Sequence, residues 1–238
     1  MSLRLDGIVH VYTSPTGEPH QVLDIPGWEL APGDQVLLRG VSGSGKTTLF
    51  NIMAGLLSPT HGTVSYEEQS LYALPERKRD VFRAGNIGYI FQSHYLVSSL
   101  TALDNVVMPM AFAGQTPRHT WKPQAKDLLA QLGLADRATY RPDQLSTGQR
   151  LRVGIARALA NGPRVLLADE PTAALDPDAA ITAMDFIQHK CEEANAILVV
   201  ASHDPALTGR FETVTDLKNG HLTTEHNPSQ ADQETIPT

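Results

Sequence analysis

The sequence has little of what several classes of protein depend on. Its single cysteine, Cys191, cannot form a disulfide within the chain, which indicates a reducing compartment. No apolar stretch approaches the roughly 18 residues of a membrane-spanning helix, and the first residues lack the apolar core of an export signal. The net charge is −7, so there is no general basic surface for nucleic acid. These absences predict a cytoplasmic protein without a membrane span of its own and without nucleic acid as a partner.

What is present is a chain of 238 residues, enough for one large domain with a substantial core. Strand-like patterns dominate residues 3–39, and the best helical patterns lie at about 95–160. After these, "RVLLAD" and "AILVVAS" are near-continuous apolar runs, typical of parallel strands buried on both faces. We therefore expect a single α/β domain over residues 1–222, closed by a hairpin with "NG" at its turn. Residues 223–238 form a polar tail that is expected to be disordered.

The segment "GVSGSGKTT" matches the phosphate-binding pattern G-x-x-x-x-G-K-[ST] at every fixed position. Its glycines let backbone N–H groups point inward at a β-phosphate, and a helix N-terminus follows the loop. Lys46 places a cation on the β and γ oxygens, and the hydroxyl of Thr47 ligates Mg²⁺. A flexible glycine turn is the simpler alternative, but the strand before and the helix after the loop favour phosphate binding. The residues expected to hold the phosphates are Ser42, Gly43, Ser44, Gly45, Lys46, Thr47 and Thr48.

Such a loop needs acids at the end of a neighbouring strand, and the chain supplies a pair of them. Asp169 ends "RVLLAD" and is placed to bind Mg²⁺ through water, and Glu170 follows it directly. A carboxylate in that position can polarise an attacking water, which a kinase would avoid. A lone pair of acids after a strand is often only solvated, but the phosphate loop upstream favours catalysis. His203 follows "AILVVAS" and could reach a γ-phosphate, although a lone histidine at a strand end is usually structural.

The segment "LSTGQRLRVGIARAL" starts at Leu145 and reads as an amphipathic helix from Leu151 on, with Arg157 largely off its apolar face. Its beginning has two interpretations. Ser146 and Gln149 form a capping box, which accounts for those two residues. Capping does not need Gly148, a poor helix former, whereas small residues with free N–H groups at a helix start can bind an anion.

In order along the chain, "GVSGSGKTT", "YIFQ", "LSTGQ", "LLADEP", "AALD" and "SH" resemble the motifs of the ATP-binding cassette (ABC) ATPases. The resemblance covers about residues 3–222 and implies a P-loop NTPase core with a parallel sheet, an N-terminal antiparallel β subdomain and an inserted helical subdomain. It implies ATP and Mg²⁺ as ligands. Gln92 would contact Mg²⁺ and the attacking water, Asp176 would be the D-loop aspartate, and His203 the switch histidine. Tyr12 stands where the family stacks an aromatic ring on adenine, although a tyrosine within a β-run also has a purely structural explanation.

The resemblance also implies a partner for the helix that begins near Ser146. In this family Ser146, Gly148 and Gln149 would face the γ-phosphate bound by a second copy of the chain. One cassette per chain then predicts a head-to-tail homodimer with twofold symmetry around two ATP molecules. Thr147 stands where the family usually has glycine, and we expect the site to work because the neighbouring residues are retained.

Residues 83–114 most resemble the branch that serves lipoprotein release, macrolide efflux and cell division. This implies a peripheral ATPase on the cytoplasmic face of the membrane that powers a separate integral membrane permease, for export or extraction. Val106–Phe112 would line a groove for a cytoplasmic helix of that permease, or would simply be subdomain core behind a capping box at Thr101 and Asp104.

Two alternative functions stay open. The ATPase could drive a transmembrane mechanical regulator that moves no cargo, which the sequence barely distinguishes from a transporter. A soluble ABC ATPase acting on nucleic acid or ribosomes is disfavoured. Such proteins usually carry two cassettes, a long coiled-coil insertion or zinc-binding cysteines, none of which is evident here.

Overall fold

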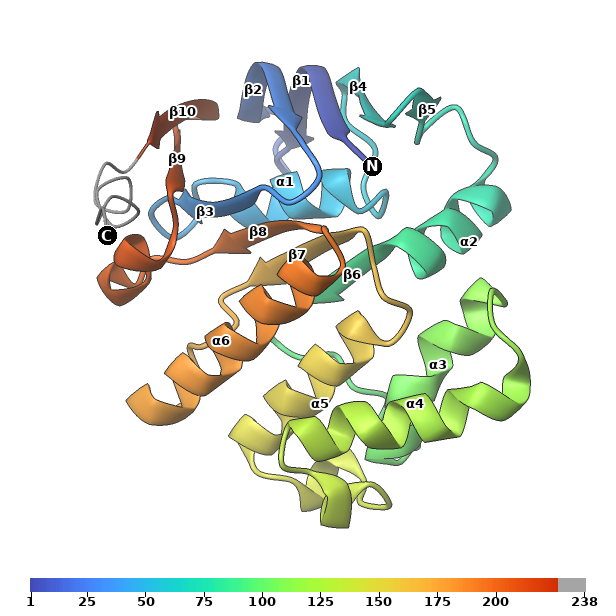
Figure 1. The fold of residues 1–238 in the computed structure, drawn as a ribbon. Coiled ribbons are helices and arrows are strands. Elements are labelled where there is room, and N and C mark those ends of the chain that lie inside the picture. Colours follow the sequence, from blue (N-terminus) through green and yellow to red (C-terminus); the bar gives the residue numbers. More distant parts are fainter. Residues whose placement is uncertain (227–238) are drawn as a thin grey trace, which may run out of the picture.

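The computed structural model describes residues 1–226, so residues 227–238 of the expected tail lie outside the described residues. Two sheets form the framework (Figure 1). The antiparallel sheet has the order β2-β1-β4-β5, with β1 (Leu3–Thr13), β2 (Pro19–Leu30), β4 (His61–Tyr66) and β5 (Gln69–Ser70). The second sheet has the order β10-β9-β3-β8-β7-β6, with β3 (Gln35–Arg39), β6 (Ile87–Ile90), β7 (Val165–Asp169), β8 (Ile197–Ala201), β9 (Thr213–Lys218) and β10 (His221–His226).

The second sheet is parallel apart from its last pair. Strands β6, β7, β8, β3 and β9 run parallel to their neighbours, and β10 pairs antiparallel with β9. The expected closing hairpin is therefore present, with Asn219 and Gly220 between its strands. Because β10 extends to His226, residues 223–226 belong to the sheet rather than to a disordered tail, and the boundary expected after residue 222 moves accordingly.

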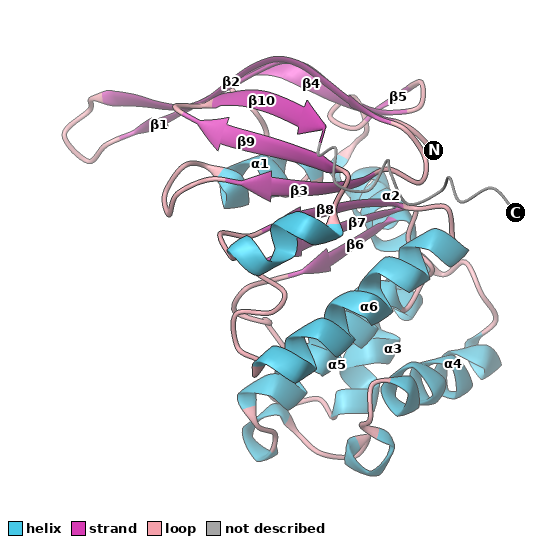
Figure 2. Cartoon of the chain, turned by 60° about the vertical axis from the view of Figure 1, so that its left-hand side comes forward, coloured by secondary structure: helices cyan, strands magenta, loops and turns pink. Residues whose placement is uncertain are grey.

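Helices cover the parallel sheet on both faces: α1 (Lys46–Met53), α2 (Glu76–Asn86), α3 (Ala102–Ala113), α4 (Arg118–Gln131), α5 (Thr147–Leu159) and α6 (Pro177–Glu193). Short 3₁₀ turns lie at Ala135–Arg137, Pro142–Gln144 and Pro205–Arg210. Figure 2 shows α1 between the two sheets and α3 to α6 on the other side of the parallel sheet. The α/β fold class and the helices expected at about 95–160 are confirmed.

Alternation along the central strands explains why helices stand on both faces. Leu38 and Val199 join the apolar cluster around α1 and the antiparallel sheet, whereas Leu37 and Val200 join the cluster around α5 and α6. All residues of β7 and β8 are buried, as the near-continuous apolar runs predict. The sheet therefore separates α1 from α5, which decides below what each helix start can contact.

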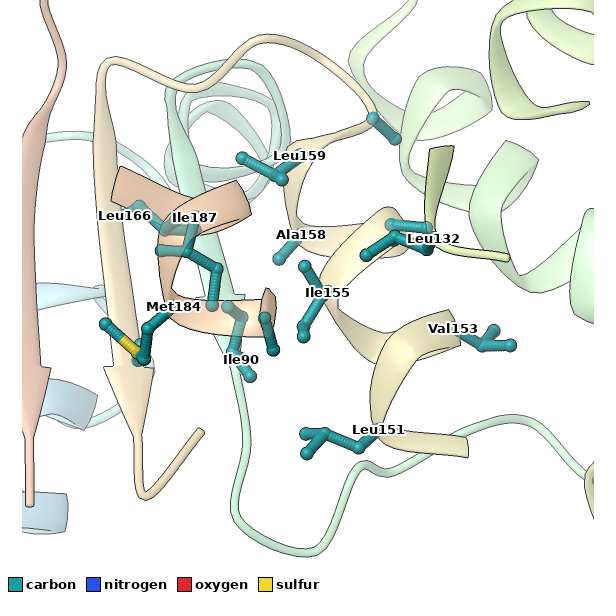
Figure 3. Close-up of a cluster of buried hydrophobic side chains, with 14 of the residues drawn as sticks. Ile90, Leu132, Leu151, Val153, Ile155, Ala158, Leu159, Leu166, Met184 and Ile187 are labelled. Atoms are coloured by element: carbon teal, nitrogen blue, oxygen red, sulfur yellow. The ribbon is translucent and has the colours of Figure 1, made fainter. Parts of the chain in front are cut away.

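The helical side of the molecule has its own apolar core, shown in Figure 3. Leu151, Ile155 and Leu159 of α5 belong to this core together with Met184 and Ile187 of α6 (Figure 3). The predicted apolar residues of this helix are buried, but Val153, Gly154 and Ala156 are buried beside them, so the second half of α5 is covered on more than one side. Within the described residues no helix is both long and apolar enough to cross a bilayer.

Cys191 lies on α6 in the same core and is 1 % exposed. Burial raises the pKa of its thiol to about 12. A thiol that stays protonated near neutral pH is a poor nucleophile, so Cys191 is the inert helical residue that the sequence indicates.

Candidate nucleotide-binding and hydrolytic site

The phosphate loop joins β3 to α1 and has the curled backbone that its sequence requires. Gly45 caps α1 with a φ of 103°, a conformation that side chains disfavour. A Cβ there would also lie 2.9 Å from Val22 Cγ1, so the position excludes other residues on two grounds. The Lys46 ammonium donates to the carbonyl oxygens of Gly40 at 2.5 Å and Val41 at 3.3 Å. The loop therefore encloses its own cation, with Ser42 and Gly43 exposed at its tip.

The end of β7 meets the start of α1 beside this loop. The hydroxyl of Thr47 donates to Asp169 Oδ2 at 2.8 Å. Burial raises the pKa of Asp169, and the charge of Glu170 adds to this, while the Thr47 hydrogen bond and Lys46 oppose it. Two oxygen ligands at a rim open to phosphates fit Mg²⁺, which takes one or two protein oxygens and completes its shell with phosphate and water. No group of three or more candidate metal ligands occurs in residues 1–226.

Glu170 is buried and has both carboxylate oxygens hydrogen-bonded. Ser202 Oγ donates to Oε2 at 3.0 Å, and His203 Nδ1 lies 2.6 Å from Oε1. The backbone of Glu170 is left-handed, with a φ of 50°, and its N–H donates to the Ala201 carbonyl at 2.9 Å. Left-handed backbone in a non-glycine residue is strained and is often found at functional sites. The side chain is thus fixed in one orientation by the loop that follows β8.

Ser202 is part of the "SH" motif, but the sequence assigns it no role in the site. Its position has a signal that could have found it: β7 and β8 pair in parallel with Asp169 opposite Ala201, so the residues after each strand come together at one edge. His203 reaches Glu170 from the same loop, and its own side chain remains 74 % exposed. Asp169, Glu170 and His203 are therefore brought together with Lys46 and Thr47, as the sequence predicts.

Tyr12 lies at the side of the phosphate loop. Its hydroxyl is 3.3 Å from the Thr48 hydroxyl on α1. The rings of Tyr12 and His10 form a T-shaped pair with their centroids 4.6 Å apart. The Tyr12 side chain is 44 % exposed, so part of it is accessible to a ligand. That position suits stacking on a base whose phosphates sit in the loop.

A second group of predicted residues makes no hydrogen bond to the phosphate loop within residues 1–226. Gln92 follows β6, is exposed and makes no hydrogen bond to any residue in the described part of the chain. Ser146 caps α5: its Oγ accepts from the Gln149 N–H at 3.2 Å, and the Gln149 side chain accepts from the Ser146 N–H at 2.9 Å. Asp176 caps α6 by accepting from Ala179 N–H at 3.0 Å. Since α1 and α5 stand on opposite faces of the sheet, the start of α5 lies on the other side of the sheet from the helix that follows the phosphate loop.

Packing explains the glycine at position 148, in addition to the anion binding expected from the sequence. A Cβ on Gly148 would lie 3.1 Å from Leu175 Cδ2, tighter than most real contacts. Leu175 immediately precedes Asp176, so the starts of α5 and α6 approach each other closely. Beside them, the Arg150 guanidinium donates to the Thr147 hydroxyl at 3.1 Å.

The helical periodicity of α5 predicts the wrong exposure for Arg157. It places Arg157 off the buried face, yet Arg157 is only 9 % exposed. Its guanidinium donates to the backbone carbonyls of His94 and Tyr95, each at 2.6 Å. A loop that lies far away in sequence thus covers a residue that the helix alone would leave in solvent.

A groove of about 650 Å³ lies between α2, α3, β6 and the end of α5. The stretch Val106–Phe112 was expected either to line a groove or to form subdomain core, and it does both. Val106 and Met110 are buried core, whereas Met108 and Phe112 line the groove, and Phe112 is 67 % exposed. The capping box expected behind the stretch is only half formed. The Thr101 hydroxyl accepts from Asp104 N–H at 3.1 Å, but the Asp104 carboxylate accepts from that same hydroxyl at 2.7 Å instead of from the Thr101 N–H.

The parallel sheet, the phosphate loop and the acids at its rim define a P-loop ATPase. Residues 23–173 match the model of the ABC transporter family. The chain is 41 % identical over 221 residues to the lipoprotein-releasing system ATP-binding protein LolD of Maricaulis maris, covering 93 % of this chain and 96 % of that protein. It is 40 % identical over 221 residues to the macrolide export ATP-binding/permease protein MacB of Chromobacterium violaceum, covering 92 % of this chain and 34 % of that one.

Solved structures agree with these relatives. A dimeric structure of the ATP-binding cassette MJ0796, bound to ADP and Pi, superposes with a TM-score of 0.88 at 33 % identity. The match covers 94 % of this chain and 98 % of that one. The chain belongs to the ABC transporter family, and it is an ATP-binding ATPase of that family, similar to lipoprotein-release and macrolide-export members.

Proposed function

We propose that this chain is the ATP-hydrolysing subunit of a membrane transporter. Two copies close around two ATP molecules and power a separate integral membrane permease that exports or extracts a substrate. The chain acts at the cytoplasmic face of the membrane as a peripheral subunit. The observation that carries the hydrolytic part is Glu170, a buried carboxylate fixed by Ser202 and His203 beside the Thr47–Asp169 pair. The names of the relatives and the groove beside α3 support the permease.

Each residue of the site has one task in this proposal. The loop N–H groups and Lys46 bind the β- and γ-phosphates, and Tyr12 stacks on the adenine. Thr47, Asp169 through water, and Gln92 would hold Mg²⁺, which supplies charge neutralisation at the phosphate oxygens when bound. Glu170 accepts a proton from the attacking water. The oxygen of that water bonds to the γ-phosphorus, and the bond between the γ-phosphorus and the oxygen that bridges to the β-phosphate breaks. Before hydrolysis, His203 holds Glu170 and contacts the γ-phosphate. The products that leave are ADP and inorganic phosphate.

The second copy supplies what the first lacks. Ser146, Gly148 and Gln149 would bind the γ-phosphate of the partner, with Asp176 at the same interface. Capping and anion binding are compatible at Ser146, because the cap uses Oγ as an acceptor and leaves its O–H to donate. The opposite placement of α1 and α5 supports this arrangement, as does the dimeric cassette of similar fold.

Thr147 is expected to be tolerated in this interface. In Thr147→Gly we expect turnover to change by less than about tenfold, roughly 1.4 kcal/mol of barrier. The reason is that Thr147 is exposed and its hydroxyl binds Arg150 of its own helix. Steady-state ATPase rates check this, with Ser146→Ala as the variant expected to lose activity. A gain above tenfold would mean that the threonine obstructs the site.

The groove offers a test of the permease. Phe112→Asp is expected to abolish co-purification with the permease and leave ATP affinity unchanged, because Phe112 is exposed and distant in sequence from the site motifs. Phe112→Leu is the matched control that keeps an apolar side chain. If the aspartate variant retains the permease, the groove is not the docking site.

The experiment that tests the whole proposal is purification from detergent-solubilised native membranes in the presence of ATP, with Glu170→Gln as the trapped form. Mass spectrometry should find a permease with few spans and a large extracytoplasmic domain. Transport of a labelled cargo in reconstituted vesicles then separates an exporter from a mechanical regulator. If only ribosomal or DNA-repair proteins co-purify, the ATPase assignment stands and the membrane role is wrong.

A further inference from the structure

The buried guanidinium of Arg157 binds main-chain carbonyls rather than an acid. Both hydrogen bonds, to His94 and Tyr95, measure 2.6 Å, and no ion pair to Arg157 occurs in residues 1–226. Burial lowers the pKa of Arg157 to about 10, so the side chain stays charged near neutral pH. A buried charge without a carboxylate is costly unless its donors are all engaged with strong acceptors. Two groups compensate this cost: the two carbonyls, and the Phe91 ring, whose centroid lies 5.9 Å from the guanidinium carbon.

The two carbonyls belong to residues with unfavourable backbone conformations. His94 has a φ of 62° and Tyr95 a φ of 42°, so two consecutive non-glycine residues are left-handed. The turn is tight: His94 N–H donates to Phe91 at 2.9 Å, and Tyr95 N–H donates to Ser93 at 2.7 Å. Such a segment persists only where its surroundings hold it.

Gln92 lies inside this turn, between the strand β6 and the two left-handed residues. On the far side, the buried Asn105 of α3 accepts from Val97 N–H at 2.8 Å and donates to the Val97 carbonyl at 3.2 Å. The loop is thus anchored to α5 by Arg157 and to α3 by Asn105. The side chain of Gln92 is exposed and makes no hydrogen bond within residues 1–226, so the path of the backbone largely decides where it points.

We propose that Arg157 is a positioning residue for Gln92. Its guanidinium holds residues 94 and 95 left-handed and so fixes the path of the loop that presents Gln92 to the nucleotide and Mg²⁺. The inference rests on the role of Gln92 in the proposed function. Arg157 and Phe91 also line the groove beside α3, so whatever occupies the groove touches the same residue that holds the loop.

The test combines a change in the guanidinium with changes in backbone preference. Arg157→Lys keeps the charge but removes the planar guanidinium, whose two terminal nitrogens each bind one of the two carbonyls. We expect kcat to fall about tenfold and the Mg²⁺ concentration for half-maximal rate to rise, with affinity for a fluorescent ATP analogue within about twofold. Tyr95 is exposed, so Tyr95→Val should fold and should reproduce the defect, because a β-branched residue resists positive φ.

Rescue separates positioning from mere support of the core. Adding Tyr95→Gly to Arg157→Lys lowers the cost of the left-handed backbone and should restore most of kcat and the Mg²⁺ dependence. If Arg157→Lys leaves both unchanged, or if Tyr95→Gly does not restore them, the proposal is wrong. Gln92→Ala is measured in parallel. A fully active Gln92→Ala refutes the role of Gln92 itself, whereas an impaired Gln92→Ala beside an unaffected Arg157→Lys refutes only the positioning.

Discussion

Glu170→Gln is expected to lower ATP turnover at least about a hundredfold while ATP still binds. Glutamine keeps the size of the side chain and can accept the hydrogen bond from Ser202, so the geometry survives. It cannot accept the proton of the attacking water. Because hydrolysis is what opens the proposed sandwich, the variant should accumulate as a dimer with ATP and Mg²⁺.

Two measurements check this expectation: phosphate release at saturating ATP, and molar mass by light scattering with and without nucleotide. Glu68→Gln, at an exposed position outside the site, is the matched control and should behave as wild type. A variant that remains monomeric with ATP and Mg²⁺ would count against the sandwich. Unchanged turnover would remove Glu170 from its role as the base.

Lys46→Ala is expected to weaken ATP binding by about tenfold to a hundredfold, the range for losing a hydrogen bond to a charged group. The ammonium is buried within the loop and reaches the carbonyls of Gly40 and Val41, so it lies where the phosphates enter. Its removal takes away the only cation that the loop itself contributes.

Affinity is measured with a fluorescent ATP analogue, and melting temperatures without nucleotide show whether the fold is kept. Lys122→Ala, at an exposed position on α4, controls for the loss of one positive charge. An ATP affinity equal to that of wild type would exclude Lys46 from phosphate binding. A loss of affinity with an unchanged melting temperature is the expected result.

The sequence could predict those parts of the site that local patterns encode. The apolar runs that end at Asp169 and just before His203 predicted the parallel strands. The glycines and Lys46 identified the phosphate loop. The pairing of Glu170 with Ser202 depends on β7 and β8 being neighbours, which is a property of strand order and not of either segment.

Arg157 shows the same limit more sharply. Helical periodicity predicts only which side of α5 packs on the domain core, and by that criterion the guanidinium of Arg157 would lie in solvent. The burial of Arg157 comes from a loop that lies 62 positions away in sequence at Tyr95. The left-handed backbone of that loop has no sequence signal either, because neither His94 nor Tyr95 is a glycine.

The inert thiol of Cys191 makes the native chain ready for site-specific labelling. A maleimide spin label needs an accessible thiolate, and Cys191 is buried with a pKa raised to about 12. A single new cysteine at the exposed His119, near the start of α4, would therefore carry the label alone. In a twofold dimer one label per chain yields one interspin distance, and its change on adding ATP would follow the approach of the two copies in solution.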